Sequence, residues 1–186
     1  MNEYKIIFLD IDGVLNSDQY NRWKYKHHMH NQGFGSIDPR ECYRMARFCE
    51  KYNIKLVISS SWRNGTSWQK TYDEFLTEGF EGLPYRHHGM KELAPYIVGV
   101  TPYSESRHRG TEIQYFFDVM KDAIENINKY KEWHQIFKEQ FIIDKYCIVD
   151  DDNDILKDQF NNFVQTDPLI GITRKDYRKI IKILEL

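Results

Sequence analysis

The chain has 186 residues, of which 41% are hydrophobic and 15% aromatic, and this composition favours one folded domain over a disordered chain. A formal net charge of −2 excludes a basic field over the whole surface that would hold nucleic acid non-specifically. No apolar stretch reaches membrane-spanning length, and the first ten residues do not resemble a signal peptide, so we expect a cytoplasmic protein with no membrane partner.

Short apolar runs alternate with helical patterns along the chain. In order, the sequence predicts a strand at 4–9, a helix at 38–52, a strand at 54–58, a helix at 111–125, strands at 145–149 and 162–165, and a helix at 173–186. Asp38 followed by Pro39 suits the start of the first helix, and Thr111 suits the second. Thr173 and Asp176 have the spacing of a capping box at the third.

This alternation predicts βαβ units and a parallel sheet, and therefore an α/β fold. We interpret residues 1–186 as a single domain, because no linker or repeat divides the chain. Segments 16–37 and 64–108 lack clear periodicity and are interpreted as loops or small lid insertions.

Three cysteines, Cys42, Cys49 and Cys147, are widely spaced and form no Cys-x-x-Cys pair. They are interpreted as free thiols in a reducing compartment, in preference to a zinc site. Several histidines could also be considered as zinc ligands, but no spacing among them supports this: His27, His28, His30, His87, His88 and His108.

Polar clusters follow three of the predicted strands directly. They are Asp10 with Asp12, the serines 59–61, and the aspartates 150–152. In a parallel sheet, the ligand crevice lies beyond the carboxyl ends of the strands, so all three clusters are expected at one edge. Each has an ordinary explanation as well, since Asp-x-Asp is common and Asp or Asn runs often cap helices. The three together, each behind a buried-type strand, favour a site.

Neighbouring carboxylates repel one another unless a cation lies between them. Mg²⁺ takes carboxylate, carbonyl, water and phosphate oxygens, so Asp10 and Asp150 are candidate ligands together with the backbone carbonyl of Asp12. A carboxylate can also attack phosphorus, with a second group acting as acid and base, a role that suits Asp12. The Ser59 hydroxyl and a cation, Arg109 or Lys91, could hold the phosphoryl oxygens.

The run DIDGVLN after a hydrophobic strand resembles the first motif of the haloacid dehalogenase (HAD) superfamily of phosphohydrolases. LVISSSWR is similar to its second motif and CIVDDDND to its acidic fourth motif. The run RGTEI at 109–113, and the later Thr166-Asp167 and Gly171-Ile172-Thr173, more narrowly resemble the HAD domains associated with Swiss Army Knife RNA repair proteins.

The resemblance implies a three-layer, Rossmann-like fold and a Mg²⁺ cofactor. It implies Asp10 as nucleophile, Asp12 as general acid and base, and Ser59 as the residue that holds the phosphoryl oxygens. Asp150 and Asp151 would serve the metal. The third motif of the superfamily usually carries a lysine, so Arg109 departs from the pattern, although an arginine can bind phosphate bidentately.

The resemblance predicts a phosphorylated small molecule or a nucleic-acid end as substrate, and the sequence indicates no obligate protein partner. Residues 20–30 mix aromatic and basic side chains, as single-strand binders do, and Trp23 is a candidate for stacking on a base. Trp62 and Arg63 are expected at the rim of the phosphate site, with Ser60 as a further substrate-binding candidate. Packing of these aromatics against the core is the ordinary alternative.

The sequence therefore predicts a Mg²⁺-dependent phosphomonoesterase acting on nucleotides or nucleic-acid terminal phosphates. Two alternatives stay open: a HAD phosphatase of a small non-nucleotide metabolite, and a binding or regulatory module that kept the fold without turnover.

Overall fold

A five-stranded parallel sheet forms the centre of the protein in a computed structural model that describes residues 1–27, 37–63, 67, 69–70, 90–126 and 136–186. The strands are β1 (Asn2–Leu9), β2 (Ile54–Ile58), β3 (Ile97–Val100), β4 (Phe141–Asp150) and β5 (Phe163–Gln165). Their order in the sheet is β3-β2-β1-β4-β5, and every pairing is parallel. The predicted α/β fold with a central parallel sheet is confirmed.

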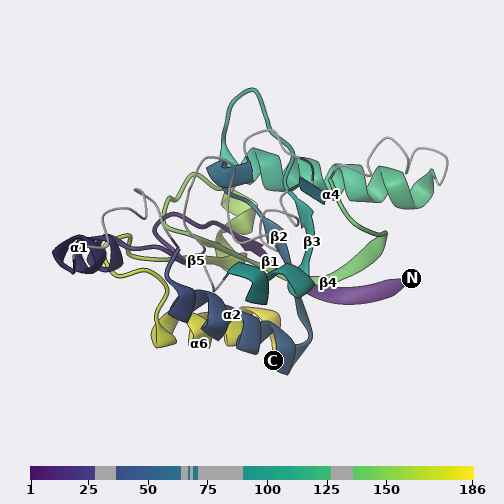
Figure 1. The fold of residues 1–186 in the computed structure, drawn as a ribbon. Coiled ribbons are helices and arrows are strands. Elements are labelled where there is room, and N and C mark those ends of the chain that lie inside the picture. The colour runs from purple at the N-terminus through teal and green to yellow at the C-terminus, as the bar shows by residue number, and fades with distance from the viewer. Residues whose placement is uncertain (28–36, 64–66, 68, 71–89, 127–135) are drawn as a thin grey trace.

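Helices cover both faces of this sheet (Figure 1). The helices are α1 (Asp18–Lys26), α2 (Pro39–Tyr52), α4 (Arg109–Glu125) and α6 (Arg174–Leu184), of which α1 lies to one side of the sheet. Helices α2 and α6 lie side by side on one face, and α4 covers the other. The core is accordingly divided in two, with side chains such as Ile7 and Leu9 facing α2 and α6, and Ile6 and Phe8 facing α4.

The predicted helix starts are correct at two of three positions. The Asp38 carboxylate accepts a hydrogen bond from the Arg40 amide at the start of α2, and Thr173 forms a capping box with Asp176 at the start of α6. The prediction that Thr111 caps the middle helix is wrong, because α4 begins earlier, at Arg109. A distant residue satisfies its first amides: Asp154 accepts from Arg109 N and from Gly110 N, each at 3.0 Å.

Strand β3 lies within segment 64–108, so residues 97–100 belong to the sheet, and the interpretation of that part as loop or lid is wrong. All four of its residues are buried. Glycine is uncommon inside strands, so Gly99 makes this strand hard to recognise in the sequence. The structure requires glycine there, because an added Cβ would lie 2.8 Å from the backbone oxygen of Ile136. Within segment 16–37, the described residues include α1, and the remaining lid predictions fall largely outside the described residues.

Cys42, Cys49 and Cys147 are free and buried, as predicted. Burial raises the pKa of each thiol, which leaves them protonated and unreactive. Across the part of the chain that the structure describes, no helix is both long enough and apolar enough to span a membrane.

Candidate active site

The strand register brings the predicted polar clusters to one edge of the sheet. Leu9 at the end of β1 pairs with Ile58 of β2 and with Val149 of β4. The next residue of each strand therefore falls in one row at the carboxyl edge, and these are Asp10, Ser59 and Asp150. Backbone hydrogen bonds continue past the strand ends, from Asp10 N to Val149 O at 3.0 Å and from Ser59 N to Leu9 O at 2.8 Å. The row is thus fixed by the sheet itself.

Two carboxylates of this row, Asp10 and Asp150, lie close to that of the next residue, Asp151. One oxygen from each of the three lies within 4.8 Å of the others. Asp10 and Asp150 are 4% and 2% exposed. Gly13, whose φ is +65°, makes room for the third, because a Cβ at that position would overlap the Asp151 carboxyl group. An all-carboxylate set of hard oxygen donors suits Mg²⁺, so these residues could hold that ion.

The electrostatics of this carboxylate cluster favour a bound cation. Burial is the main cause that raises the pKa of Asp10, and the neighbouring charge of Asp150 raises it further, against the opposing effects of Arg109 and a hydrogen bond from Ser60. Burial likewise raises the pKa of Asp150, although Arg109 opposes it, and the pKa of Asp151 is raised mainly by burial. A divalent cation among these oxygens would keep all three ionised.

Arg109 spans the two buried aspartates from the start of α4. Its Nε donates to Asp150 Oδ2 at 2.8 Å, and its Nη2 donates to Asp10 Oδ1 at 3.2 Å. Of the two cations considered for this position, Arg109 makes these contacts, while Lys91 lies in a short 3₁₀ turn, Met90–Glu92, that precedes β3. A guanidinium placed here can neutralise an incoming phosphate.

The Arg109 side chain is itself positioned by Glu112, a residue that the sequence reasoning missed. Glu112 is 3% exposed and accepts from Arg109 Nη1 at 3.4 Å and from Arg63 Nη2. A signal was present, because Glu112 precedes Phe116 by one helical turn and so lies on the buried face of α4. Buried carboxylates at such positions normally have a cationic partner.

Arg63 does not lie at the rim of the site, and that expectation is wrong. Its side chain is 1% exposed, because the 3₁₀ turn Ser61–Arg63 directs it inward to Glu112. It also donates to the backbone oxygen of Ser60 at 2.6 Å and lies over the ring of Tyr103, 4.5 Å from its centroid. Arg63 therefore ties the serine loop to α4.

The carboxylate of Asp12 is held separately from the carboxylate cluster. Trp62 Nε1 donates to one of its oxygens and Asn16 Nδ2 to the other, each at 2.7 Å. Trp62, expected at the rim, thus contacts a candidate catalytic residue directly. The role of Asn16 was missed, although the residue ends the DIDGVLN motif. Asp12 was also predicted to bind the metal through its backbone carbonyl, and this stays a prediction.

Two serines reach the site in different ways, and both are buried. The Ser59 hydroxyl accepts from Thr101 Oγ1 at 3.2 Å, whereas the Ser60 hydroxyl accepts from Trp62 N at 3.4 Å and lowers the pKa of Asp10. Ser60 therefore affects the pKa of the candidate nucleophile, while Ser59 lies in the same row of the sheet as Asp10. Both stay candidates for holding phosphoryl oxygens.

Among the described residues, no contact brings Trp23 to the carboxylates. It is 47% exposed on α1, where it stacks near Tyr20 and lies 4.7 Å from the His27 ring, centroid to centroid. It lines a hollow of about 290 Å³ that also contains Asn16. Of the histidines considered as zinc ligands, four lie outside the described residues: His28, His30, His87 and His88.

Comparison with protein-family models gave one relevant match. The model described as "HAD domain in Swiss Army Knife RNA repair proteins" matches residues 6–177, which include every site residue described above. Comparisons with curated proteins and with solved structures gave no match.

Proposed function

Because the chain belongs to the family of HAD domains in Swiss Army Knife RNA repair proteins, we propose that it is a Mg²⁺-dependent phosphomonoesterase of nucleotides or nucleic-acid terminal phosphates. The observation that carries this proposal is the position of Arg109 between Asp10 and Asp150, with Asp151 beside them. One small volume thus holds a candidate nucleophile, a set of metal ligands and a cation for phosphate.

Asp10 is the proposed nucleophile. One of its carboxylate oxygens attacks phosphorus, and the bond between phosphorus and the leaving oxygen breaks as the aspartyl-phosphate bond forms. Asp12 donates a proton to the leaving oxygen. In the second half, Asp12 takes a proton from a water molecule that attacks phosphorus, and inorganic phosphate leaves with Asp10 restored. Trp62 and Asn16 orient Asp12 for both transfers.

The remaining groups bind and orient the phosphoryl group. Arg109, released from part of its pairing with Asp10, would donate to phosphoryl oxygens, and the hydroxyls of Ser59 and Ser60 lie in reach of the same row. A Mg²⁺ ion held by Asp10, Asp150 and Asp151 would supply compensation for the negative charge of the phosphoryl group. The burial of Asp10 and Asp150 keeps competing water away from these carboxylates.

The proposed substrate class has two supports. The family description places related domains in RNA repair proteins, and a role in RNA repair would suit the end of a nucleic-acid strand as substrate. The hollow that Asn16 lines also presents an exposed indole, Trp23, and Asn16 in turn donates to Asp12. An exposed indole in a hollow that shares Asn16 with the candidate site could stack on a base, and a sugar phosphate offers no base for it.

The test is phosphate release in the presence of Mg²⁺ from a panel of p-nitrophenyl phosphate, 5′- and 3′-mononucleotides, 5′- and 3′-phosphorylated oligonucleotides and sugar phosphates. We expect release from the nucleic-acid members, abolished by EDTA and by Asp10→Asn. A preference for sugar phosphates would favour the metabolite phosphatase. A folded protein that binds Mg²⁺ but releases phosphate from no member would favour a catalytically silent module.

A further inference from the structure

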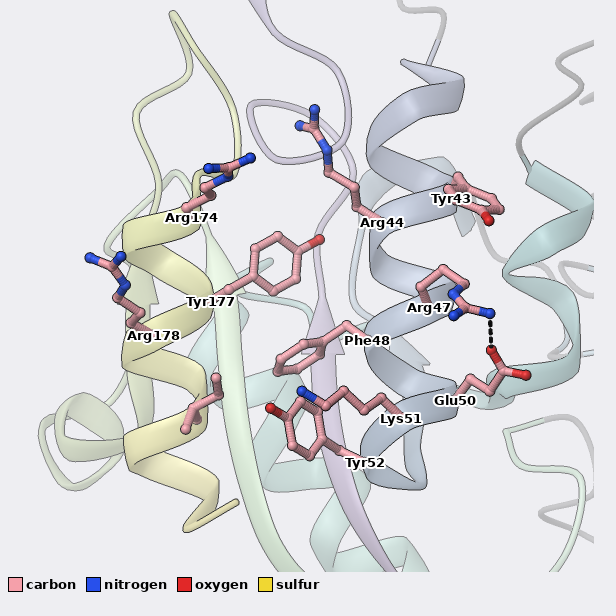
Figure 2. A pocket seen from close by; sticks show the side chains of 11 residues that line it. Tyr43, Arg44, Arg47, Phe48, Glu50, Lys51, Tyr52, Arg174, Tyr177 and Arg178 are labelled. Carbon is pink, nitrogen blue, oxygen red and sulfur yellow. Dashed lines mark hydrogen bonds and ion pairs between the residues drawn. The ribbon is translucent and has the colours of Figure 1, made fainter.

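A basic groove runs between helices α2 and α6, on the face of the sheet away from α4 (Figures 1 and 2). It has a volume of about 830 Å³. We define the α2–α6 groove by its lining residues, among which five are cationic and one is acidic: Arg44, Arg47, Lys51, Arg174, Arg178 and Glu50. On a chain whose net charge is −2, such a local excess of positive charge indicates an anionic partner.

Three of the five cations are available for a ligand. Arg44 pairs with Glu41 and Arg47 with Glu50, so these two are already partly neutralised. Within the described part of the chain, Arg174 and Arg178 have no carboxylate partner, and both side chains are exposed. Lys51 lies over the Tyr52 ring, 4.6 Å from its centroid. Figure 2 shows Arg174 and Arg178 on α6 at the margin of the groove.

The floor between the two helices is aromatic. Phe48 lies between Tyr52 and Tyr177, with ring centroids 5.0 Å from each. All three rings are partly buried and leave some surface in the groove. The Tyr177 hydroxyl is buried and has no hydrogen-bond partner among the described residues, and Figure 2 shows it pointing into the space between the helices. A polar group left in this way can accept a hydrogen bond from a ligand or a water molecule.

The groove and the hollow beside the candidate active site share a lining residue. Arg44 lines both the α2–α6 groove and the hollow that contains Trp23 and Asn16. Asn16 in turn donates to Asp12. A flexible anionic chain could therefore pass from the carboxylate cluster over the hollow and into the groove.

We propose that the α2–α6 groove binds the body of a single-stranded nucleic acid whose phosphorylated end occupies the active site. Cations along the margin would contact phosphates, and the aromatic floor would contact bases, which is the usual composition of single-strand sites. The identification of the bound strand as substrate rests on the proposed function, but binding itself does not. An acidic polypeptide would bind through the cations alone, and the aromatic side chains at the floor of the groove would add nothing to its affinity.

The experiment is fluorescence anisotropy with a labelled 12-nucleotide single strand, as RNA and as DNA, and the full chain in EDTA so that no turnover occurs. The variant carries both Arg174→Ala and Arg178→Ala. Its matched control carries Lys121→Ala and Lys157→Ala, which removes the same charge from exposed positions outside the groove. We expect the groove variant to bind roughly tenfold more weakly, with a shallower dependence on salt, and the control to bind like the wild type.

Two competitors separate the chemistry of the ligand. A 12-unit abasic strand keeps the phosphates but lacks bases, and we expect it to compete several-fold more weakly than the normal strand. Equal competition by the abasic strand or by a polyglutamate peptide would overturn the proposal in favour of an acidic partner. Equal loss of binding in the control variant, or no loss in the groove variant, would also overturn it. Phosphate release from p-nitrophenyl phosphate by the wild type tests the proposed function alone.

Discussion

The indole Nε1 of Trp62 donates a hydrogen bond to Asp12 Oδ2 at 2.7 Å, across fifty positions of sequence. Through this contact, the loop that follows β2 orients Asp12, the candidate acid and base. Asn16 donates to the other carboxylate oxygen of Asp12. Asp12 is thereby kept apart from the three carboxylates that could bind a cation. The two aspartates of the DIDGVLN motif consequently have different partners and different proposed tasks.

Trp62→Phe removes this donor but keeps an aromatic ring. A hydrogen bond to a charged group contributes about 1.5–3 kcal/mol, so we expect kcat/KM for phosphate release to fall by roughly tenfold or more. Mg²⁺ affinity, measured by calorimetry, should change little because the Asp12 side chain lies outside the carboxylate cluster. Ser61→Ala, at an exposed position in the same turn, is the control and should leave both quantities near their wild-type values.

The free energy of unfolding should depend on pH through Asp10 and Asp150. Burial raises the pKa of Asp10 and of Asp150 above that of an unfolded aspartate. Above about pH 4, the metal-free folded protein therefore binds more protons than the unfolded chain does. Their contribution to stability is complete below that pH and is lost as the pH rises through the raised values. Mg²⁺ binds the ionised form, and we expect it to raise the melting temperature more at about pH 8 than at about pH 5.

Asp10→Asn provides the comparison for this pH dependence. It removes one ionisable group and its repulsion with Asp150, so the metal-free variant should lose less stability between acidic and mildly alkaline pH. The measurement is thermal denaturation in EDTA across this pH range. An identical decline of stability in the variant and the wild type would argue against these carboxylates as the origin of the effect.

Gly110→Ala should destabilise the protein, against the usual helix preference. Alanine is favoured over glycine inside a helix by about 1 kcal/mol. At Gly110, however, an added Cβ would overlap the backbone nitrogen of Leu156, in the segment that follows the aspartates of β4. We expect a net loss of about 1–3 kcal/mol in urea unfolding, with weaker Mg²⁺ binding because Arg109 and the acidic loop are displaced together. The neighbouring exposed substitution Thr111→Ala should stay within about 0.5 kcal/mol of wild type.

Asp176→Asn should weaken the start of α6. Burial alone would raise the pKa of Asp176, but hydrogen bonds from Thr173 and Lys179 outweigh it and hold the pKa below its ordinary value. The stabilisation is therefore present above about pH 4 and is lost as the pH falls through the lowered value. At neutral pH we expect a loss of about 1 kcal/mol in urea unfolding. Variant and wild type should converge in strongly acidic solution, and a constant difference at all pH values would contradict the capping explanation.

Local signals in the sequence were sufficient for four of the five strands and for the carboxylates. Asp10 and Asp150 each follow a continuous apolar strand, and parallel strands deliver their carboxyl ends to one edge. Strand β3 was missed because it is four residues long and contains Gly99. A short strand with a glycine resembles a loop until its neighbour, β2, is known to lie beside it.

Contacts between distant segments could not be derived in this way. The inward direction of Arg63 depends on Glu112, which is 49 positions away, and the cap of α4 comes from Asp154. Such partners are chosen by tertiary packing, and the residue types alone are compatible with a solvent-exposed role. The same reason explains why the hydrogen bond from Trp62 to Asp12 was not predicted.

The arrangement of the strands also determines when the site can exist during folding. Strand β1 is central, and its longest pairing is with β4, from Asn2 opposite Phe141 to Leu9 opposite Val149. Contacts between segments so far apart in sequence close slowly, because a long loop must lose its freedom before they form. Asp10 and Asp150 thus meet only when the sheet closes, and recovery of Mg²⁺ binding during refolding would time that closure. A partly folded chain would hold the candidate nucleophile, Asp10, apart from Asp150 and Asp151, so we expect it to lack any phosphatase activity that the folded protein has.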